Sequence, residues 1–334
     1  MARYIIIGAG AVGASIGARL FENGEHVVLV ARGDHYRALR EHGLRFATPE
    51  GERTLPIPAI DRPEALAPGD DDVLLLATKT QDSAAALDAW AGHVRHGDRS
   101  APVILAQNGV ENERLALRRF ARVYAMCVWL PATHLEPGVV QAQGSPVTGV
   151  LHLGRYPHGQ DDFAHEMART LEKSGFRAPV RPDVMRWKYA KLLSNLTNSI
   201  QALCGPEHSD EAEALYTRVR AEGIAVLDAA GIAYASREEE APLRQLLKLQ
   251  PVAGQRRGGG SSWQSLVRGT GSIETDYLNG EIVLLGRLHG VPTPVNETLQ
   301  HLATAHAREH RSPATFSVAE LSAHIEQNAG DAKS

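Results

Sequence analysis

The amino-terminal segment YIIIGAGAVGASIG, residues 4–17, constrains the fold of this chain more than any other. A short apolar run leads into Gly8, Gly10 and Gly13, which are spaced as G-x-G-x-x-G. In this arrangement the first glycine permits a tight turn, the second lets a pyrophosphate approach the backbone, and the third lets the following helix pack closely on the strand. The start of that helix offers amide donors to phosphate. The sequence therefore predicts a dinucleotide-binding turn whose residues are Gly8, Ala9, Gly10, Ala11, Val12 and Gly13.

The first half of the chain alternates apolar, strand-like runs with helical segments. HVVLVAR, DDVLLLAT and APVILAQ are near-continuous apolar runs of this kind. Such strands alternating with helices predict a parallel sheet that is covered on both faces. From Pro182 onward the pattern is mainly helical. We therefore expect an α/β fold, with a Rossmann-type doubly wound domain over 1–180, an all-α substrate and catalytic domain over 181–325, and a flexible tail over 326–334.

Composition limits the partners of the chain. A net charge of −4 offers no footprint for nucleic acid or an anionic membrane. The two cysteines, Cys127 and Cys204, have no metal-type spacing, which argues against both a metal site and a disulfide framework. The apolar runs are too short to cross a bilayer. The glycine turn begins so early that the first residues lack the apolar region and cleavage site of a secretory signal. We expect a cytoplasmic protein that acts on small molecules.

Three residues near predicted strand ends bear on the nucleotide. The run HVVLVAR ends at Arg32, where an NAD site usually carries an acid and where arginine can receive a 2′-phosphate. Arg32 thus favours NADP, although Asp34 keeps NAD open. Lys79 follows the next buried strand and would add positive charge, or else is a solvent-exposed lysine. Asn108, in the loop AQNGVENE, either forms a turn or reaches the nicotinamide or substrate.

The segment KYAKLLSNLTNSIQAL, residues 188–203, has the composition of a helix. Its residues Lys191, Asn195 and Asn198 fall at i, i+4 and i+7, so a continuous helix would place them along one side. Taken alone, this stripe is either a solvated face or a functional site.

Several motifs together resemble the ketopantoate reductase family. They are the glycine turn, TKTQD, QNGVEN, KYAKLLSNLTNS and SSWQSLVRGTGSIETDYLNGEIVLLGRLHGVPTPVN, which cover nearly the whole chain. Members of this family are NADPH-dependent 2-dehydropantoate 2-reductases, oxidoreductases of pantothenate biosynthesis. The resemblance implies NADP as the cofactor and ketopantoate or another 2-oxo acid as the substrate. It is also compatible with a homodimer.

A residue-by-residue match to the family implies roles for the polar stripe and for three residues outside it. Lys191 matches the catalytic lysine, which would act as general acid. Glu274 matches the catalytic glutamate, which would orient the lysine or the substrate and lie near the cofactor. The matched substrate-binding residues are Asn108, Asn195, Asn198 and Ser262, with Asn198 the looser match. The lysine and amide stripe would then form the floor of an interdomain cleft.

The chemistry of 2-oxo acid reduction agrees with these roles. Hydride transfer turns the carbonyl oxygen into an alkoxide, and a lysine beside it stabilises the charge and supplies a proton. Trp263 and Ser265 depart from the S-M-x-Q-D pattern common in the family, so a different 2-oxo acid stays open as the substrate. A second alternative is an NADP-sensing binding protein without activity. The glycine-rich run VAGQRRGGGSS, residues 252–262, is a candidate lid.

Overall fold

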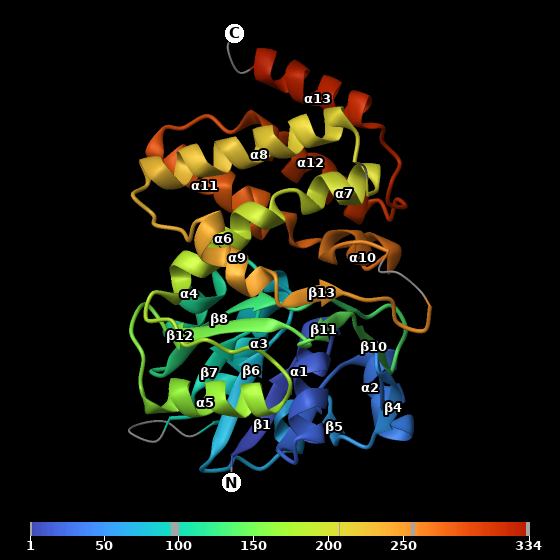
Figure 1. Ribbon diagram of the computed structural model, residues 1–334, viewed down its shortest axis with the longest axis vertical. Helices are drawn as coiled ribbons and strands as arrows, with labels where there is room; N and C mark the ends of the chain where they lie inside the picture. The colour runs from blue at the N-terminus through green and yellow to red at the C-terminus, as the bar shows by residue number, and fades with distance from the viewer. Residues whose placement is uncertain (1, 95–99, 207, 255–257, 332–334) are drawn as a thin grey trace. The chain divides into compact units, whose positions relative to one another are not determined.

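The computed structural model describes residues 2–94, 100–206, 208–254 and 258–331 (Figure 1). The described residues within 1–188 and 235–257 form one compact unit, and those within 189–234 and 258–334 form a second. The boundary falls inside α6 (Val184–Asn195), directly after Lys188. The candidate lid is interrupted by residues 255–257, which lie outside the described residues.

The first unit contains a seven-stranded sheet in the order β12-β8-β7-β6-β1-β2-β5. Neighbouring strands are parallel except β12 and β8, which run antiparallel. The strands are β1 (Arg3–Ile7), β2 (His26–Val30), β5 (Ala59–Ile60), β6 (Asp72–Leu76), β7 (Val103–Leu105), β8 (Val123–Trp129) and β12 (Val150–Arg155). The predicted doubly wound sheet is confirmed, with one antiparallel strand at an edge.

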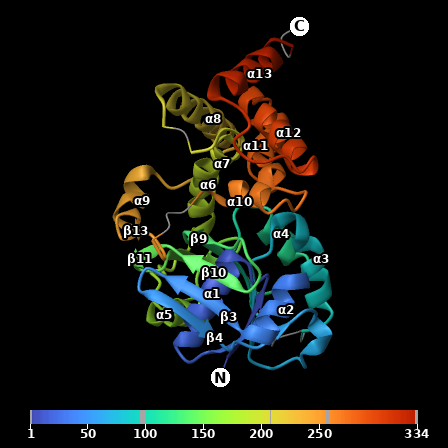
Figure 2. The ribbon, with the colours of Figure 1, turned by 90° about the vertical axis from the view of Figure 1, so that its right-hand side faces the viewer.

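Alternate side chains of β1 enter two different cores. Ile6 packs into a cluster that includes residues of α1 and α5, whereas Ile5 and Ile7 pack into a cluster that includes residues of α3 and α4. A strand that is buried on both faces needs apolar residues at consecutive positions, which explains the unbroken run YIII. Figure 2 shows α3 and α4 on the side of the sheet opposite α5. The helical elements of the first unit up to α5 are α1 (Ala11–Glu22), α2 (Gly33–His42), the 3₁₀ turn η1 (Pro63–Ala65), α3 (Thr80–Ala91), α4 (Asn112–Leu117) and α5 (Asp162–Lys173).

A second sheet, in the order β4-β3-β10-β9, packs against α1. Phe46 on β3 and Val140 on β10 are fully buried in the same core as Ile16 on α1. The strands of this sheet are β3 (Leu44–Thr48), β4 (Gly51–Leu55), β9 (Ala132–Thr133) and β10 (Val139–Ala142). Together the two sheets enclose the helix that follows the glycine turn.

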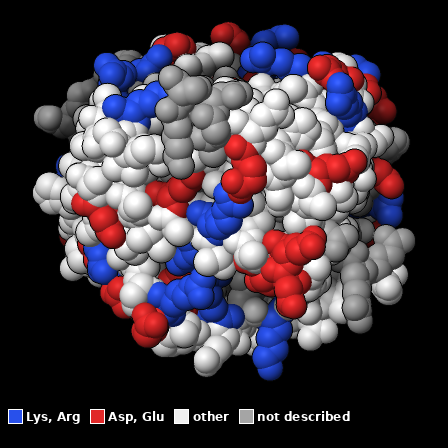
Figure 3. Space-filling model, turned by 90° about the horizontal axis from the view of Figure 1, so that it is seen from above, with Lys and Arg blue, Asp and Glu red and all other residues white. Residues whose placement is uncertain are grey.

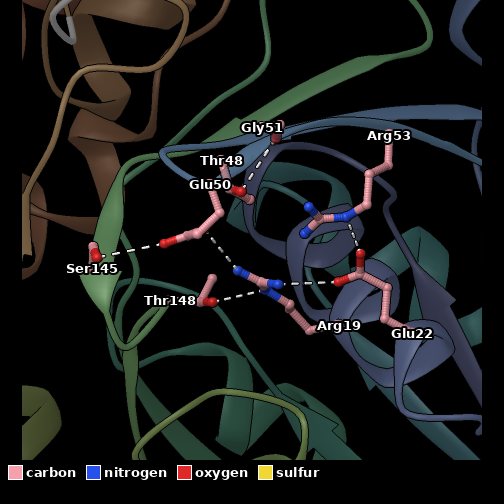
Figure 4. Close-up of polar contacts among 8 residues, drawn as sticks. All are labelled: Arg19, Glu22, Thr48, Glu50, Gly51, Arg53, Ser145 and Thr148. Carbon is pink, nitrogen blue, oxygen red and sulfur yellow. Dashed lines mark hydrogen bonds and ion pairs between the residues drawn. The ribbon is translucent and has the colours of Figure 1, made fainter.

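A polar network holds the carboxyl-terminal end of α1 (Figure 4). Arg19 donates through Nε to Thr148 Oγ1 at 2.8 Å and through Nη1 to Glu22 Oε2 at 3.1 Å. Arg53, on β4, forms an ion pair with the same Glu22. The Arg19 Nη2 also lies 3.6 Å from Glu50 Oε2 in the β3–β4 turn. These contacts fix the orientation of the helix whose amino terminus follows the glycine turn.

Residues 235–254 belong to the first unit, although the sequence predicts them within the helical domain. They form α9 (Arg237–Arg244) and β13 (Leu247–Leu249). β13 pairs antiparallel with β11 (Gly144–Pro146), and Arg244 lies 4.5 Å from the centroid of the Trp129 ring. The mainly helical pattern expected from Pro182 onward therefore does not hold at residues 247–249, because pairing with β11 draws them into a strand.

The second unit is helical in its described residues, as predicted. Its elements beyond α6 are α7 (Asn198–Cys204), α8 (Asp210–Ala229), α10 (Ser261–Val267), η2 (Glu274–Tyr277), α11 (Asn279–His289), α12 (Pro294–Arg308) and α13 (Val318–Asp331). The helix predicted over 188–203 is instead two helices, with a turn at 196–197. Residues 326–331, expected in the flexible tail, are helical. None of the helices in the described ranges has the length and apolarity needed to cross a membrane.

Candidate active site

The three glycines of the amino-terminal turn each meet a different steric demand. Gly8 has a φ of +95°, and a Cβ on it would lie 2.7 Å from the Thr78 nitrogen. A Cβ on Gly13 would lie 2.2 Å from the Gly8 carbonyl oxygen, so α1 packs on this turn only with glycine there. A Cβ on Gly10, the N-cap of α1, would meet no atom within 4 Å. Tight packing behind the turn and open space at Gly10 fit a bound pyrophosphate.

His35, a residue that sequence reasoning missed, fixes the same turn. Its Nδ1 accepts from the Gly138 amide at 2.9 Å, and its Nε2 lies 2.7 Å from the Ala9 carbonyl oxygen. Because a backbone amide can only donate, Nδ1 carries no proton and Nε2–H donates to Ala9. The His35 ring also lies against His134, with centroids 4.3 Å apart. The hydrogen bond from His35 Nε2 to the Ala9 carbonyl oxygen links α2 directly to the middle of the glycine turn.

Arg32 and Lys79 follow the two strands that flank β1. Arg32 is the N-cap of α2, two residues after the end of β2, and its side chain is exposed. Asp34, in the first turn of α2, forms an exposed ion pair with Arg37. Lys79 is the N-cap of α3 and follows Thr78, the residue against which Gly8 packs. Since neighbouring parallel strands end at the same edge, both cations lie at the edge that carries the glycine turn.

Asn108 lies in the loop after β7, and buried contacts anchor that loop. Gln107 donates from Nε2 to the Thr78 carbonyl oxygen at 2.9 Å. Lys188 Nζ donates to the Gln107 carbonyl oxygen at 3.1 Å and forms an ion pair with Glu113. The Lys188 and Glu113 side chains are 2% and 0% exposed. No motif of the sequence assigns a role to Gln107, Glu113 or Lys188, although the polar run QNGVENE after a buried strand contains the first two.

In the second unit, α6 carries Lys191 and Asn195, and α7 begins at Asn198. Lys191 and Asn198 are partly buried, while Asn195 is 4% exposed. Within the described part of the chain, Asn195 Nδ2 has no hydrogen-bond partner. The turn at 196–197 interrupts the predicted stripe, so the direction of Asn198 is set by α7 rather than by α6.

Ser262 and Glu274 also lie in the second unit, 1% and 5% exposed. Ser262 Oγ lacks a hydrogen-bond partner among the residues that the structure describes. A Cβ on Gly260 would lie 3.4 Å from Asn198 Oδ1, so the segment before Ser262 passes close to Asn198. Buried polar atoms in native proteins are normally paired, and a polar ligand would pair Asn195 Nδ2 and Ser262 Oγ.

The two departures from the family pattern have separate structural explanations. A Cβ on Gly258 or Gly259 would lie 2.7 Å or 2.6 Å from the Trp263 ring, so the indole packs directly on that backbone. The glycine-rich run and Trp263 are therefore one feature, because the glycines make room for the ring. Ser265 is buried and donates to the Ser261 carbonyl oxygen at 3.1 Å within α10.

Any site for an anion on this chain must draw its positive charge from local groups. On the face shown in Figure 3, acidic and basic side chains are interspersed, and the chain carries a net charge of −4. A broad field that attracts anions is therefore absent from that face. Across the described ranges, no group of three or more His, Cys, Asp or Glu side chains could hold a metal ion.

Two family models match most of the chain. Residues 4–158 match the family model described as ketopantoate reductase PanE/ApbA, and residues 183–307 match the model of its C-terminal part. The chain belongs to the ketopantoate reductase family. The resemblance stated from the motifs is thereby confirmed, and the family's curated members include 2-dehydropantoate 2-reductases, which are oxidoreductases.

Individual family members align with the chain over nearly its whole length. The 2-dehydropantoate 2-reductase of Pyrococcus horikoshii is 29% identical over 310 residues, which are 91% of this chain and 97% of the relative. That of Caulobacter vibrioides is 30% identical over 319 residues, 92% and 100% of the two chains. The ketopantoate reductase structure from Ralstonia eutropha JMP134 superposes with a TM-score of 0.76 at 28% identity, covering 93% and 99%. D-mandelate dehydrogenase, solved with NADH and anilino(oxo)acetate, shares the fold with a TM-score of 0.79 at 23% identity, covering 93% and 99%.

Proposed function

We propose that this chain catalyses the NADPH-dependent reduction of a 2-oxo acid, with 2-dehydropantoate as the substrate. Besides family membership, one observation carries the proposal: Asn195 Nδ2 and Ser262 Oγ are buried in the second unit with no hydrogen-bond partner among the described residues, and Lys191 lies one turn before Asn195 on α6. Leaving a buried donor unpaired costs about 1–3 kcal/mol, so a polar ligand at these atoms would stabilise the arrangement.

Each residue has a defined task in this reaction. When bound, the reduced nicotinamide supplies a hydride to C2 of the oxo acid. Lys191 stabilises the negative charge that develops on the carbonyl oxygen and donates a proton to it. Glu274 orients Lys191 or the substrate. Ser262 binds the substrate carboxylate, and the amides of Asn195 and Asn198 bind the 4-hydroxyl group.

The proposed cofactor is NADP rather than NAD. Arg32 presents an exposed guanidinium at the end of β2, where a 2′-phosphate would lie, whereas Asp34 is engaged by Arg37. The glycine turn would hold the pyrophosphate and Lys79 would add positive charge beside it. Asn108, and Glu274 of the second unit, would bind near the nicotinamide. NAD is the alternative, since D-mandelate dehydrogenase, which shares the fold, was solved with NADH.

The purified protein with NADPH and a panel of 2-oxo acids tests the proposal. We expect NADPH oxidation with 2-dehydropantoate and a higher kcat/KM for NADPH than for NADH. Lys191→Ala should lower kcat by about 10²–10⁴-fold while NADPH affinity is retained, because it removes the proton donor and not a nucleotide contact. Lys248→Ala, at an exposed lysine on β13, is the matched control. Turnover of Lys191→Ala at the wild-type rate would show that the mechanism is wrong.

A different 2-oxo acid is a second candidate substrate, and Trp263 favours it. Its indole packs on Gly258 and Gly259, four and three residues before Ser262, so the family's usual surroundings of that serine are changed. Strong reduction of another oxo acid without turnover of 2-dehydropantoate would establish this alternative. NADPH binding without oxidation by any oxo acid would instead indicate a sensing protein.

A further inference from the structure

A buried network of amide side chains runs through the second unit to the turn between α6 and α7. Asn279, the first residue of α11, donates from Nδ2 to the Leu196 carbonyl oxygen at 3.1 Å and to Asn296 Oδ1 at 3.0 Å. Its Oδ1 accepts from Ser199 Oγ at 2.6 Å. Asn279, Asn296 and Ser199 are fully buried. One side chain thus contacts backbone and side-chain groups on both sides of residues 197–198.

The far end of this network is fixed by a carboxylate. Glu222, on α8, accepts the backbone amides of Val295 and Asn296 at 2.9 Å and 3.0 Å, and Asn296 Nδ2 at 2.8 Å. A carboxylate at the amino terminus of a helix, here α12, is favoured by the helix dipole and by the amides exposed there. Asn296 Nδ2 therefore faces Glu222, which leaves its Oδ1 to accept from Asn279.

This arrangement determines the orientation of the Asn279 amide. Rotating the amide by half a turn would bring its oxygen against both the Leu196 carbonyl oxygen and Asn296 Oδ1, which are acceptors. In an uninterrupted helix, the Leu196 carbonyl would accept only from the amide four residues on. Here the Asn279 side chain also donates to it, in the turn between the end of α6 and the start of α7.

We propose that Asn279 is a positioning residue for substrate binding. It holds the turn at 196–197, and this turn sets the direction of Asn198 relative to Asn195. Asn279 acts through Leu196 and Ser199 and does not itself touch the substrate. The inference rests on the proposed function, in which Asn195 and Asn198 bind the 2-oxo acid.

The test compares two substitutions that each replace a buried polar group by an apolar one of similar size. Asn279→Leu removes the amide from the network. Thr298→Val, on α12, removes a buried hydroxyl that donates to the Pro294 carbonyl oxygen at 2.8 Å and accepts from Asn328 Nδ2 at 3.0 Å; neither bond involves residues 195–199. Both variants lose a buried hydrogen bond, so both are expected to melt at a lower temperature. Ser199→Ala, which removes one of the three Asn279 bonds, should give an intermediate effect.

Activity is measured with the 2-oxo acid that the wild type reduces best. For Asn279→Leu we expect kcat/KM to fall by about tenfold or more, mainly through KM, with NADPH affinity unchanged. Amide hydrogen exchange in a peptide covering residues 192–201 should accelerate. For Thr298→Val, both kcat/KM and this exchange should stay at wild-type values.

Two results would overturn the positioning role. One is unchanged exchange in Asn279→Leu, and the other is faster exchange with unchanged kcat/KM. A failure of the proposed function is recognised separately, in the wild-type protein. In that case NADPH binds but no 2-oxo acid is reduced, and Asn279 has no positioning role in reduction.

Discussion

His152, on β12, is a histidine held neutral in the core of the first unit. Its ring is fully buried, stacked on Trp187 with centroids 4.3 Å apart and edge-on to Trp129 at 4.7 Å. Burial, followed by the positive charges of Arg181 and Arg244, lowers the pKa of His152 from 6.5 to about 3. The Arg181 Nε donates to His152 Nδ1 at 3.4 Å, which is compatible only with an unprotonated Nδ1.

This pKa predicts an acid-sensitive stability. Because the folded pKa lies below the unfolded value, the His152 contribution is fully present above pH 6.5 and is lost as the pH falls from there toward 3. Between pH 6.5 and about pH 5 the free energy of unfolding should drop by about 2 kcal/mol from this residue. Urea unfolding at a series of pH values measures the drop, and His152→Phe, which cannot titrate, should show a flatter profile. Equal pH slopes for the two proteins would contradict the prediction.

At the scale of elements, one buried ion pair connects α6 to the loop and helix that follow β7. Lys188 on α6 reaches both Glu113 on α4 and the Gln107 carbonyl oxygen, one residue before Asn108. A buried pair of this kind contributes little net stability compared with apolar residues of similar size. Removing only one partner, however, leaves the other charge buried without its counter-charge. The pair is therefore a strong constraint on how these elements pack together.

A comparison of a single and a double variant tests this constraint. Glu113→Gln should lower the free energy of unfolding by about 3–5 kcal/mol, because Lys188 then keeps an uncompensated buried charge. The double variant Glu113→Leu with Lys188→Met should lie much closer to the wild type. The exposed pair of Arg45 and Glu52 is the comparison, and its disruption should cost less than about 1 kcal/mol. Similar costs for the two single disruptions, measured by denaturant titration, would refute the buried-charge explanation.

At the scale of the whole molecule, the chain leaves the first unit inside α6 and returns to it at residue 235. On return, the Ala235 backbone amide donates to the Arg186 carbonyl oxygen at 3.1 Å. The Gln250 backbone amide donates to the Gln143 backbone carbonyl oxygen at 2.8 Å. Arg186 also pairs with Glu239 on α9, at 3.0 Å. The first unit is therefore completed by a segment that is distant in sequence.

A fragment experiment follows from this chain path. Residues 1–188 alone should aggregate or melt without a cooperative transition, because the Trp129 ring and the edge of β11 lose their covering segment. Joining residues 235–254 to the fragment by a long glycine-serine linker should restore a cooperative melt, detectable by calorimetry or near-ultraviolet circular dichroism. A cooperative melt of the short fragment at the temperature of the linked one would show that the return segment is dispensable.

The sequence alone determined the features that depend on local pattern. The parallel sheet followed from apolar runs that bury both faces, and the steric demands at Gly8 and Gly13 match those expected from G-x-G-x-x-G. The helical character of the second unit followed from its composition and glycine stops. The resemblance to the ketopantoate reductase family likewise came from short motifs, which keep their spacing along the chain.

Features that depend on residues far apart in sequence follow from the three-dimensional packing of the chain. The pattern over 188–203 favours one helix, but Asn279, more than 80 residues beyond Leu196, donates to the turn that divides it. Likewise, residues 247–249 form a strand because β11 pairs with them, and Lys188 is buried because Glu113 neutralises it. Local periodicity reports which face of an element is apolar, whereas the partner of a buried polar group is set by packing, and no short window of sequence contains both partners.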